Sequence, residues 1–195
     1  HPKFKLVRGD NLDLPALTGA MKGCDIVFHL AAVVSGQAEQ DFDLGWRVNV
    51  DATRNLLEVC RHTQQHIRFV FASSLAVYGG NVSAKVDDYT AVTPMSSYGA
   101  QKAIGELMVN DYSRKSFVDG RVLRLPTICV RPGRPNQAAS SFVSSVIREP
   151  LGGEPADIPM GAAAARAAVQ LNLSIDGVVA ADRGVVRKMG AFTGS

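Results

Sequence analysis

The sequence predicts an α/β fold, a doubly wound parallel sheet with helices on both of its faces. Three observations predict this class. Apolar segments with the length of buried strands alternate with segments of helical periodicity. The apolar segments end in small or polar residues, as strands do where they enter a turn. The predicted strands are separated by predicted helices. A helix that joins two strands of one sheet forms a right-handed crossover between parallel strands.

The first half of the chain supplies four of the expected elements. Residues 3–10, KFKLVRGD, alternate in polarity and stop at a Gly-Asp turn, so we expect a strand there. Residues 11–23 follow as a short helix with Pro15 in its first turn, where a missing N–H loses no partner. Residues 24–36, CDIVFHLAAVVSG, form a near-continuous apolar run that predicts a strand covered on both faces. Residues 43–63 carry apolar side chains at helical spacing and predict a long helix.

The second half repeats the alternation. Residues 67–80, IRFVFASSLAVYGG, predict another buried strand, and residues 120–130, GRVLRLPTICV, predict a further one. Between these strands, Ser96 or Ser97 can cap the start of a helix that runs toward Lys115.

Composition narrows the functional classes. The chain has 195 residues, of which 46% are hydrophobic, enough for one buried core. The formal net charge is only +3 and the basic residues are scattered, so we expect no nucleic-acid partner. No apolar run approaches the ~20 residues of a membrane span, so we expect no membrane partner. The spacing of the three cysteines, Cys24, Cys60 and Cys129, is not that of zinc ligands, so we expect no metal. We expect their thiols to be reduced and the protein to be cytoplasmic.

Tyr98 and Lys102 are the first candidates for chemistry. Positions i and i+4 lie on one face of a helix, so the two side chains can act on one target. The spacing alone favours a solvated surface pair, because YxxxK arises often by chance. The strand ends change this weighting, since ligands of parallel sheets bind beyond the carboxyl ends of the strands. Those ends are residues 9–10, 30–32, 73–74 and 126–127, and most of their side chains are small or polar.

Six segments in order resemble the extended short-chain dehydrogenase/reductase family, the group of nucleotide-sugar epimerases and dehydratases. They are RGDNLD, DIVFHLAA, WRVNVDATRNLLEVC, FASSLAVYGG, SSYGAQKAIGEL and RVLRLPTICVRPG. The segment RLPTICVRPGRPNQAASSFVSSVIREPL resembles more particularly the D-erythronate dehydrogenase branch, whose members oxidise the 2-hydroxyl of a small sugar acid with NAD. The resemblance implies a Rossmann-like fold, NAD as cofactor, a sugar-acid substrate and a homodimer that pairs through the helices at 41–60 and 96–115.

The resemblance also implies roles for individual residues. Tyr98 would take the proton of the substrate hydroxyl, and Lys102 would favour the phenolate by its charge and hold the nicotinamide ribose. Ser74 would hydrogen-bond the reacting oxygen. Besides Tyr98 and Lys102, the cofactor-binding residues would be Asp10, Leu30, Ala31, Ala32, Asn49, Ser73 and Pro126. For Ser73, a structural contact stays open as the alternative.

The implied substrate contacts are Ser35, Ser74, Arg131 and Gln137. A sugar acid needs a cation for its carboxylate, and Arg131 follows directly after the last predicted strand, with Arg134 in reserve. An arginine that only solvates a loop is the alternative for Arg131.

Two features depart from the family pattern. The family's first strand, its glycine-rich phosphate turn and its second strand would precede Lys3, and no G-x-x-G-x-x-G occurs in the chain. We therefore expect a chain truncated at its N-terminus, lacking the first two strands and binding dinucleotide weakly. We expect residues 1–135 to form a partial dinucleotide-binding domain. We expect residues 136–195 to form a small irregular remnant of the substrate side, atypical beyond about residue 155.

Three functional hypotheses remain. The first is NAD-dependent oxidation of a sugar acid such as D-erythronate. The second is a nucleotide-sugar epimerase or dehydratase that uses the same Tyr98 and Lys102. The third is an inactive fragment or a non-catalytic binding module, against which the joint presence of Ser74, Tyr98 and Lys102 argues.

Overall fold

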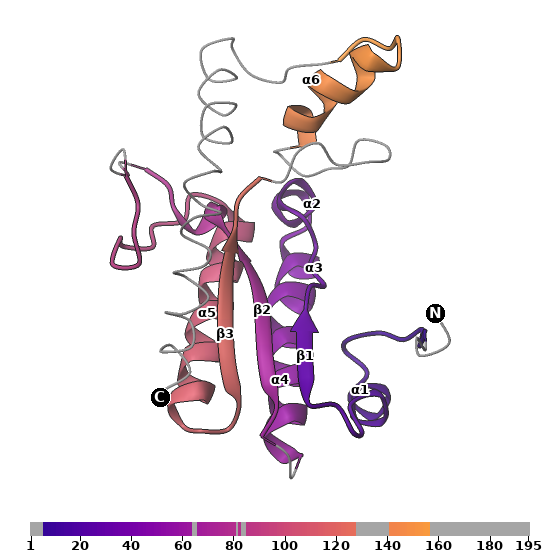
Figure 1. The fold of residues 1–195 in the computed structure, drawn as a ribbon, viewed down its shortest axis with the longest axis vertical. Helices are drawn as coiled ribbons and strands as arrows, with labels where there is room; N and C mark the ends of the chain where they lie inside the picture. The colour runs from indigo at the N-terminus through magenta and orange to yellow at the C-terminus, as the bar shows by residue number, and fades with distance from the viewer. Residues whose placement is uncertain (1–5, 64–65, 81, 83–84, 128–140, 157–195) are drawn as a thin grey trace.

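A sheet of three parallel strands forms the centre of the computed structural model, which describes residues 6–63, 66–80, 82, 85–127 and 141–156. The strands are β1 (Ile26–His29), β2 (Arg68–Ser74) and β3 (Asp119–Leu125), and they lie side by side in that order (Figure 1). Strands β1 and β2 fall inside segments for which the sequence predicted a strand, and β3 begins one residue before its predicted segment. The predicted α/β class with parallel strands is confirmed.

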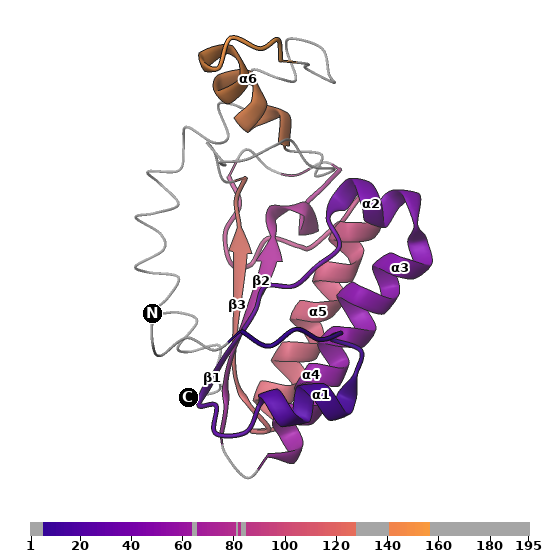
Figure 2. The same cartoon turned by 90° about the vertical axis from the view of Figure 1, so that its right-hand side faces the viewer.

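The helices connect the strands and lie on one side of them. Helix α1 (Leu14–Ala20) precedes β1, and α5 (Ser97–Arg114) joins β2 to β3. Between β1 and β2 run α2 (Ser35–Gln40), α3 (Phe42–Trp46), a π-helical turn (Arg47–Asp51) and α4 (Ala52–His62). Figure 2 shows helices α1 to α5 against one face of the sheet and α6 (Ser141–Leu151) beyond the carboxyl ends of the strands. Among the described residues, the opposite face carries no helix.

One strand prediction was wrong, and another extended too far along the chain. Residues 6–10 are not in a strand, because a strand needs a hydrogen-bonded neighbour and none of the described residues pairs with them. The strand predicted for residues 24–36 ends at His29, where its pairing with Phe71 of β2 ends. Beyond it, the backbone of Val33 bonds to the Asn49 side chain instead of to a strand.

The start of α5 agrees with the sequence. Ser96 is the N-cap, and its hydroxyl accepts a hydrogen bond of 3.1 Å from the Gly99 N–H. The helix runs to Arg114, with Lys115 as the C-cap. The long helix predicted for residues 43–63 is found as α3 and α4, with the π-helical turn between them.

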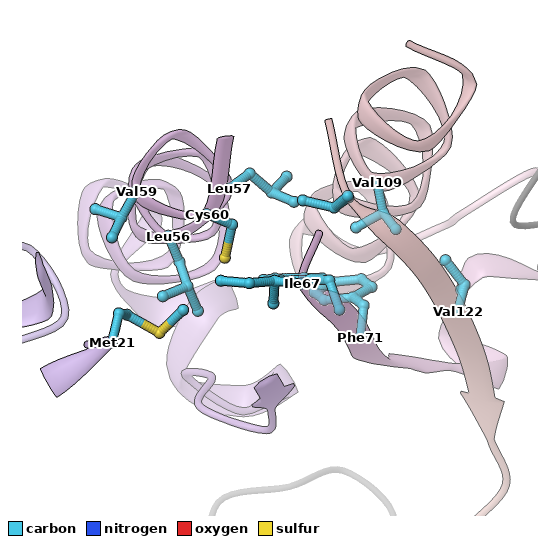
Figure 3. Packing of buried hydrophobic residues seen from close by; sticks show 11 residues of the cluster. Met21, Leu56, Leu57, Val59, Cys60, Ile67, Phe71, Val109 and Val122 are labelled. Carbon is cyan, nitrogen blue, oxygen red and sulfur yellow. The ribbon is translucent and has the colours of Figure 1, made fainter. Parts of the chain in front are cut away.

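The core fills the space between the sheet and helices α4 and α5 (Figure 3). Phe69 and Phe71 of β2 point into it and are almost wholly buried. Burial of an aromatic side chain of this size contributes roughly 1.5 to 3 kcal/mol. The other members of the cluster are Met21, Leu56, Leu57, Val59, Cys60, Ile67, Val109, Val118 and Val122.

Gly105 sets how closely α5 approaches this core. A Cβ atom at this position would lie 2.5 Å from Cζ of the Phe71 ring. Because glycine has no Cβ atom, the helix can pack directly on β2. This close packing places Lys102, nearly one turn earlier in the helix, against the carboxyl end of the strand.

Candidate functional site

The first turn of α5 is fixed against the chain that leaves β2. A Cβ atom on Gly99 would fall far inside contact distance of the Ala76 carbonyl oxygen, so only glycine permits this approach. On its other side, the Glu39 carboxylate at the end of α2 accepts a hydrogen bond of 3.0 Å from the Ser97 N–H. A carboxylate at a helix N-terminus also complements the helix dipole. These two contacts hold Tyr98, which lies between Ser97 and Gly99.

Ser74 and Tyr98 meet at this junction. Ser74 is the last residue of β2, and its Oγ accepts a hydrogen bond of 3.1 Å from the Ala76 N–H. Burial raises the pKa of Tyr98 above 10, and the hydrogen bond with the Ser74 side chain lowers it again in part. A hydroxyl that donates to the phenol oxygen stabilises the phenolate more than the phenol, which gives the direction of that second effect.

Lys102 lies one turn after Tyr98 and is buried, with 3% of its surface exposed. Its Nζ donates a hydrogen bond of 2.7 Å to the Ala72 carbonyl of β2. The same nitrogen lies 4.8 Å from the centre of the Phe71 ring and 5.7 Å from that of Tyr98. Burial lowers the pKa of Lys102 to about 8, so the ammonium form still predominates at pH 7.

The pKa of Tyr98 differs in direction from what we expected. We predicted that Lys102 would make the phenol more acidic, whereas burial makes it less acidic in the structure. The ammonium is oriented toward the Ala72 carbonyl and lies beside the face of the tyrosine ring. In this arrangement, desolvation of the phenolate outweighs the attraction of the neighbouring charge.

Ser73 points the other way, into the protein. It is buried, and its Oγ donates a hydrogen bond of 2.5 Å to Oε1 of Glu106 on α5. Among the two roles we considered for Ser73, this contact fits the structural one better than direct contact with a cofactor.

Glu106 belongs to a network that the sequence analysis missed. Its carboxylate binds the Arg124 guanidinium of β3, with Nη2 at 2.7 Å and Nε at 3.0 Å. Arg124 in turn donates a hydrogen bond of 2.5 Å to the Tyr78 hydroxyl. The network thus ties α5, the carboxyl ends of β2 and β3, and the segment after Ser74 into one unit. Glu106 follows Lys102 by four residues, so the helical spacing that revealed Tyr98 and Lys102 could have revealed it.

Asn49 occupies the π-helical turn and reaches the segment after β1. Its Oδ1 accepts a hydrogen bond of 2.8 Å from the Val33 N–H, and its Nδ2 donates one of 3.0 Å to the Val33 carbonyl. Its Nδ2 also donates a bond of 2.7 Å to Gln101 Oε1 on α5. π-Helical turns occur frequently at functional sites. Here the turn presents an amide to the backbone of the segment that we expect to line a cofactor.

His29 is a further buried polar residue that we had not singled out. It ends β1, and its Nε2 lies 2.8 Å from Thr53 Oγ1 on α4. The Thr53 hydroxyl donates to the Asn49 carbonyl, so it accepts from a neutral imidazole that carries its proton on Nε2. Burial, and to a smaller extent the charge of Lys102, lowers the pKa of His29 to about 4.

The remaining predicted residues are placed as follows. Leu30 and Ala31 are exposed and Ala32 is half-buried, directly after the carboxyl end of β1. Pro126 is half-buried directly after β3, and Ser35 is the first residue of α2. Asp10 is exposed and its Oδ1 accepts a hydrogen bond of 2.9 Å from the Leu12 N–H in its own turn. Arg131, Arg134 and Gln137 lie outside the described residues.

The structure therefore brings Ser74, Tyr98 and Lys102 together at the carboxyl end of β2. The exposed Leu30 and the small Ala31 and Ala32 follow the end of the neighbouring strand β1. This arrangement suits a flat cofactor laid across the strand ends, with a hydroxyl donor, a phenol and an ammonium beside it.

Among the described residues, no group of three or more His, Cys, Asp and Glu side chains is arranged to hold a metal ion. No helix in that part of the chain combines the length and the apolar character needed to cross a membrane.

Known proteins resemble the chain in sequence. It matches the NAD dependent epimerase/dehydratase family over residues 1–167. It is 60% identical over 159 residues to the D-erythronate dehydrogenase of Cupriavidus necator, covering 81% of this chain and 49% of that protein. The chain spans about half the length of the curated relatives that it matches.

Solved structures resemble it in fold. A nucleoside-diphosphate-sugar epimerase from Agrobacterium tumefaciens superposes with a TM-score of 0.72 at 46% identity, covering 78% of this chain and 46% of that one. A UDP-glucuronic acid 4-epimerase from Bacillus cereus, solved with NAD, gives a TM-score of 0.66 at 28% identity, covering 81% and 49% of the two chains.

Proposed function

The chain belongs to the NAD dependent epimerase/dehydratase family, and from this premise we propose that it acts in the NAD-dependent oxidation of a small sugar acid such as D-erythronate. One observation carries the proposal: Ser74, Tyr98 and Lys102 converge at the carboxyl end of β2. The substrate class is supported by the 60% identity to a D-erythronate dehydrogenase.

The cofactor fits the residues at the strand ends. Ala31 and Ala32 are small and reach the surface, so a dinucleotide can approach their backbone closely. Lys102 and Tyr98 would hold its nicotinamide half, and NAD when bound supplies the acceptor for a hydride. We propose that Asn49 contributes indirectly, by holding Val33 and with it the residues that precede it.

The side chains of this protein handle the proton. The Ser74 hydroxyl donates to the reacting oxygen, which orients the substrate hydroxyl toward Tyr98 Oη. The phenolate form of Tyr98 accepts the hydroxyl proton while the hydride leaves the carbon that bears the hydroxyl. Lys102, protonated at neutral pH because its pKa is about 8, stabilises the phenolate from beside the ring. Loss of the hydride and the proton converts the hydroxy acid into a keto acid.

We propose that the substrate carboxylate is bound by Arg131, with Ser35 and Gln137 near its hydroxyls. Ser35 begins α2 close to the end of β1, while Arg131 and Gln137 lie outside the described residues. A homodimer that pairs through the helices of residues 41–60 and 96–115 also stays a prediction. So does the division into residues 1–135 and 136–195.

The experiment follows NADH formation when the protein is mixed with NAD and D-erythronate. The proposal predicts net accumulation of NADH and an equal amount of keto acid. The matched control is the 2-deoxy analogue, which keeps the carboxylate but has no hydroxyl to oxidise at that carbon and should give no NADH. Absence of NADH with both compounds would contradict the proposal.

A second candidate function is epimerisation of a nucleotide sugar, supported by the 46% identity to the Agrobacterium tumefaciens epimerase. An epimerase returns the hydride to its substrate. It would therefore convert a UDP-sugar into its epimer without net NADH, and product analysis separates the two functions.

A further inference from the structure

We propose that Gln101 is a positioning residue that couples the helix of Tyr98 and Lys102 to the segment at 30–34 through Asn49. The inference rests on the proposed function, because that segment is expected to line the cofactor. Gln101 is 0% exposed, and it lies between Tyr98 and Lys102 on α5. It therefore moves with the two residues that act on the substrate proton.

The hydrogen bonds fix the direction of both amides. The Val33 N–H can only donate, so the atom of Asn49 that faces it is the acceptor Oδ1. The Nδ2 of Asn49 then faces Gln101, and the atom that receives its bond must be an oxygen. The side chain of residue 101 must therefore accept the hydrogen bond from Asn49. The connection from α5 to Val33 is broken if residue 101 offers no acceptor.

Two features show that a glutamine is accommodated here at a cost. Its Nε2 finds no hydrogen-bond partner among the described residues, and burial of an unpaired donor destabilises a fold. A Cβ atom on Gly45 would lie 2.6 Å from that Nε2, so α3 has a glycine at the one place where a side chain would strike the amide. An apolar residue of the same length would avoid the unpaired donor. The gain from glutamine is therefore the bond from its Oε1 to Asn49.

The bond matters because Asn49 is the group that orders Val33. Asn49 bonds both the N–H and the carbonyl of Val33, in the way that a neighbouring strand would. Without Gln101, the Asn49 amide loses one of its restraints and can rotate away. The segment that carries Leu30, Ala31 and Ala32 would then shift relative to Tyr98 and Lys102.

The test uses Gln101→Met, which is close in size but replaces the amide oxygen by a thioether, a much weaker acceptor, and Gln101→Glu, which keeps an oxygen facing Asn49. Both are compared with the unmodified full chain by hydrogen exchange of single backbone amides. In Gln101→Met, the Val33 amide should exchange roughly 5 to 10 times faster, as expected for loss of one buried hydrogen bond. The Phe71 amide of β2 should be unchanged, and Gln101→Glu should restore slow exchange at Val33.

Steady-state kinetics supply the second readout. In Gln101→Met, the KM for NAD should rise by a similar factor of about 5 to 10 while kcat stays within about twofold. A side chain that only fills space would not separate the two constants. If the unmodified protein shows no NAD turnover, the proposed function fails, whereas the exchange measurement still decides the coupling.

The inference is overturned if Val33 exchange in Gln101→Met equals that of the unmodified chain, or if Val33 and Phe71 accelerate together. Should Gln101→Met fail to fold, the Gly45→Ala variant tests the coupling instead. Its added methyl displaces the Gln101 amide without altering either amide group. Faster exchange at Val33 in Gly45→Ala supports the coupling, and unchanged exchange contradicts it.

Discussion

The two ends of α5 each carry a tyrosine, and their surroundings differ. Tyr98, at the carboxyl end of the sheet, has the neutral Ser74 hydroxyl beside its phenol and the Lys102 ammonium 5.7 Å from its ring centre. Tyr112, at the opposite end, bonds to the Glu58 carboxylate. Burial raises the pKa of both, and the bond to Glu58 raises that of Tyr112 further, to about 12.

The difference lies in what happens when the proton leaves. At Tyr112 a phenolate would contact a carboxylate, so two negative charges would meet. At Tyr98 a phenolate would have a hydroxyl donor beside its oxygen and an ammonium 5.7 Å from its ring centre, and both favour it. Burial alone does not identify a base; the partners of the deprotonated form do. This difference supports the proposed role of Tyr98 as the base.

The largest expected effect concerns the ion pairs along α5. Glu106, midway along α5, pairs with Arg124 of β3, with side chains 9% and 27% exposed, whereas Asp111 and Arg114 pair near the Tyr112 end with side chains 60% and 65% exposed. Glu106→Ala leaves Ser73 without its acceptor and removes the carboxylate from Arg124, which keeps only the Tyr78 hydroxyl, and should lower the free energy of unfolding by about 3 to 5 kcal/mol. Asp111→Ala should change it by no more than about 0.5 kcal/mol. Urea denaturation measures both, and equal losses would contradict the contrast.

The next effect is the pH dependence contributed by His29. Its pKa is 6.5 in the unfolded chain and about 4 in the fold, so between these values the unfolded state binds more protons. Stability must therefore fall as the pH drops from about 6.5 to about 4, by up to about 3 kcal/mol. His29→Asn, which cannot take up a proton, should remove this part of the acid destabilisation. A variant whose stability falls with pH as steeply as that of the unmodified chain would refute the assignment.

A smaller effect is expected at the glycine that seats α5. Gly99→Ala forces the helix away from the Ala76 carbonyl and should cost about 2 kcal/mol of stability. The matched control is Gly19→Ala in α1, where a Cβ atom would meet nothing within 4 Å. This control should gain about 0.5 to 1 kcal/mol, because alanine favours a helix over glycine. Thermal unfolding compares the two variants. Similar shifts in Tm would show that α5 does not pack against the Ala76 carbonyl at Gly99.

The sequence predicted the elements whose signals are local. Apolar runs located β1, β2 and β3, and the N-cap chemistry of Ser96 located the start of α5 within one residue. The strand predicted at residues 3–10 failed because pairing is a property of the neighbour as well as of the segment, and alternation alone does not supply that neighbour. The end of β1 was misplaced for a related reason, since the Asn49 amide takes the place of a strand beside Val33.

The site was predictable only in part. The spacing of Tyr98 and Lys102 and the serines after β2 were visible as a pattern, together with the resemblance to a known family. The contacts of Gln101 with Asn49 join residues 52 positions apart, and no local pattern encodes such a pair. The direction of the Tyr98 pKa was missed because burial depends on how the whole site packs. The comparison of Tyr98 with Tyr112 likewise needs the partners, which the sequence does not display.

The most direct measurement compares Tyr98→Phe with Tyr112→Phe in the rate of NADH formation from D-erythronate. Both variants remove one hydroxyl from α5, and neither removes a ring. The account predicts that Tyr98→Phe lowers kcat by roughly 100-fold to 10,000-fold, the usual contribution of a general base, while Tyr112→Phe stays within about twofold of the unmodified protein. A Tyr98→Phe variant that retained its rate, or two variants that lost equal activity, would contradict it.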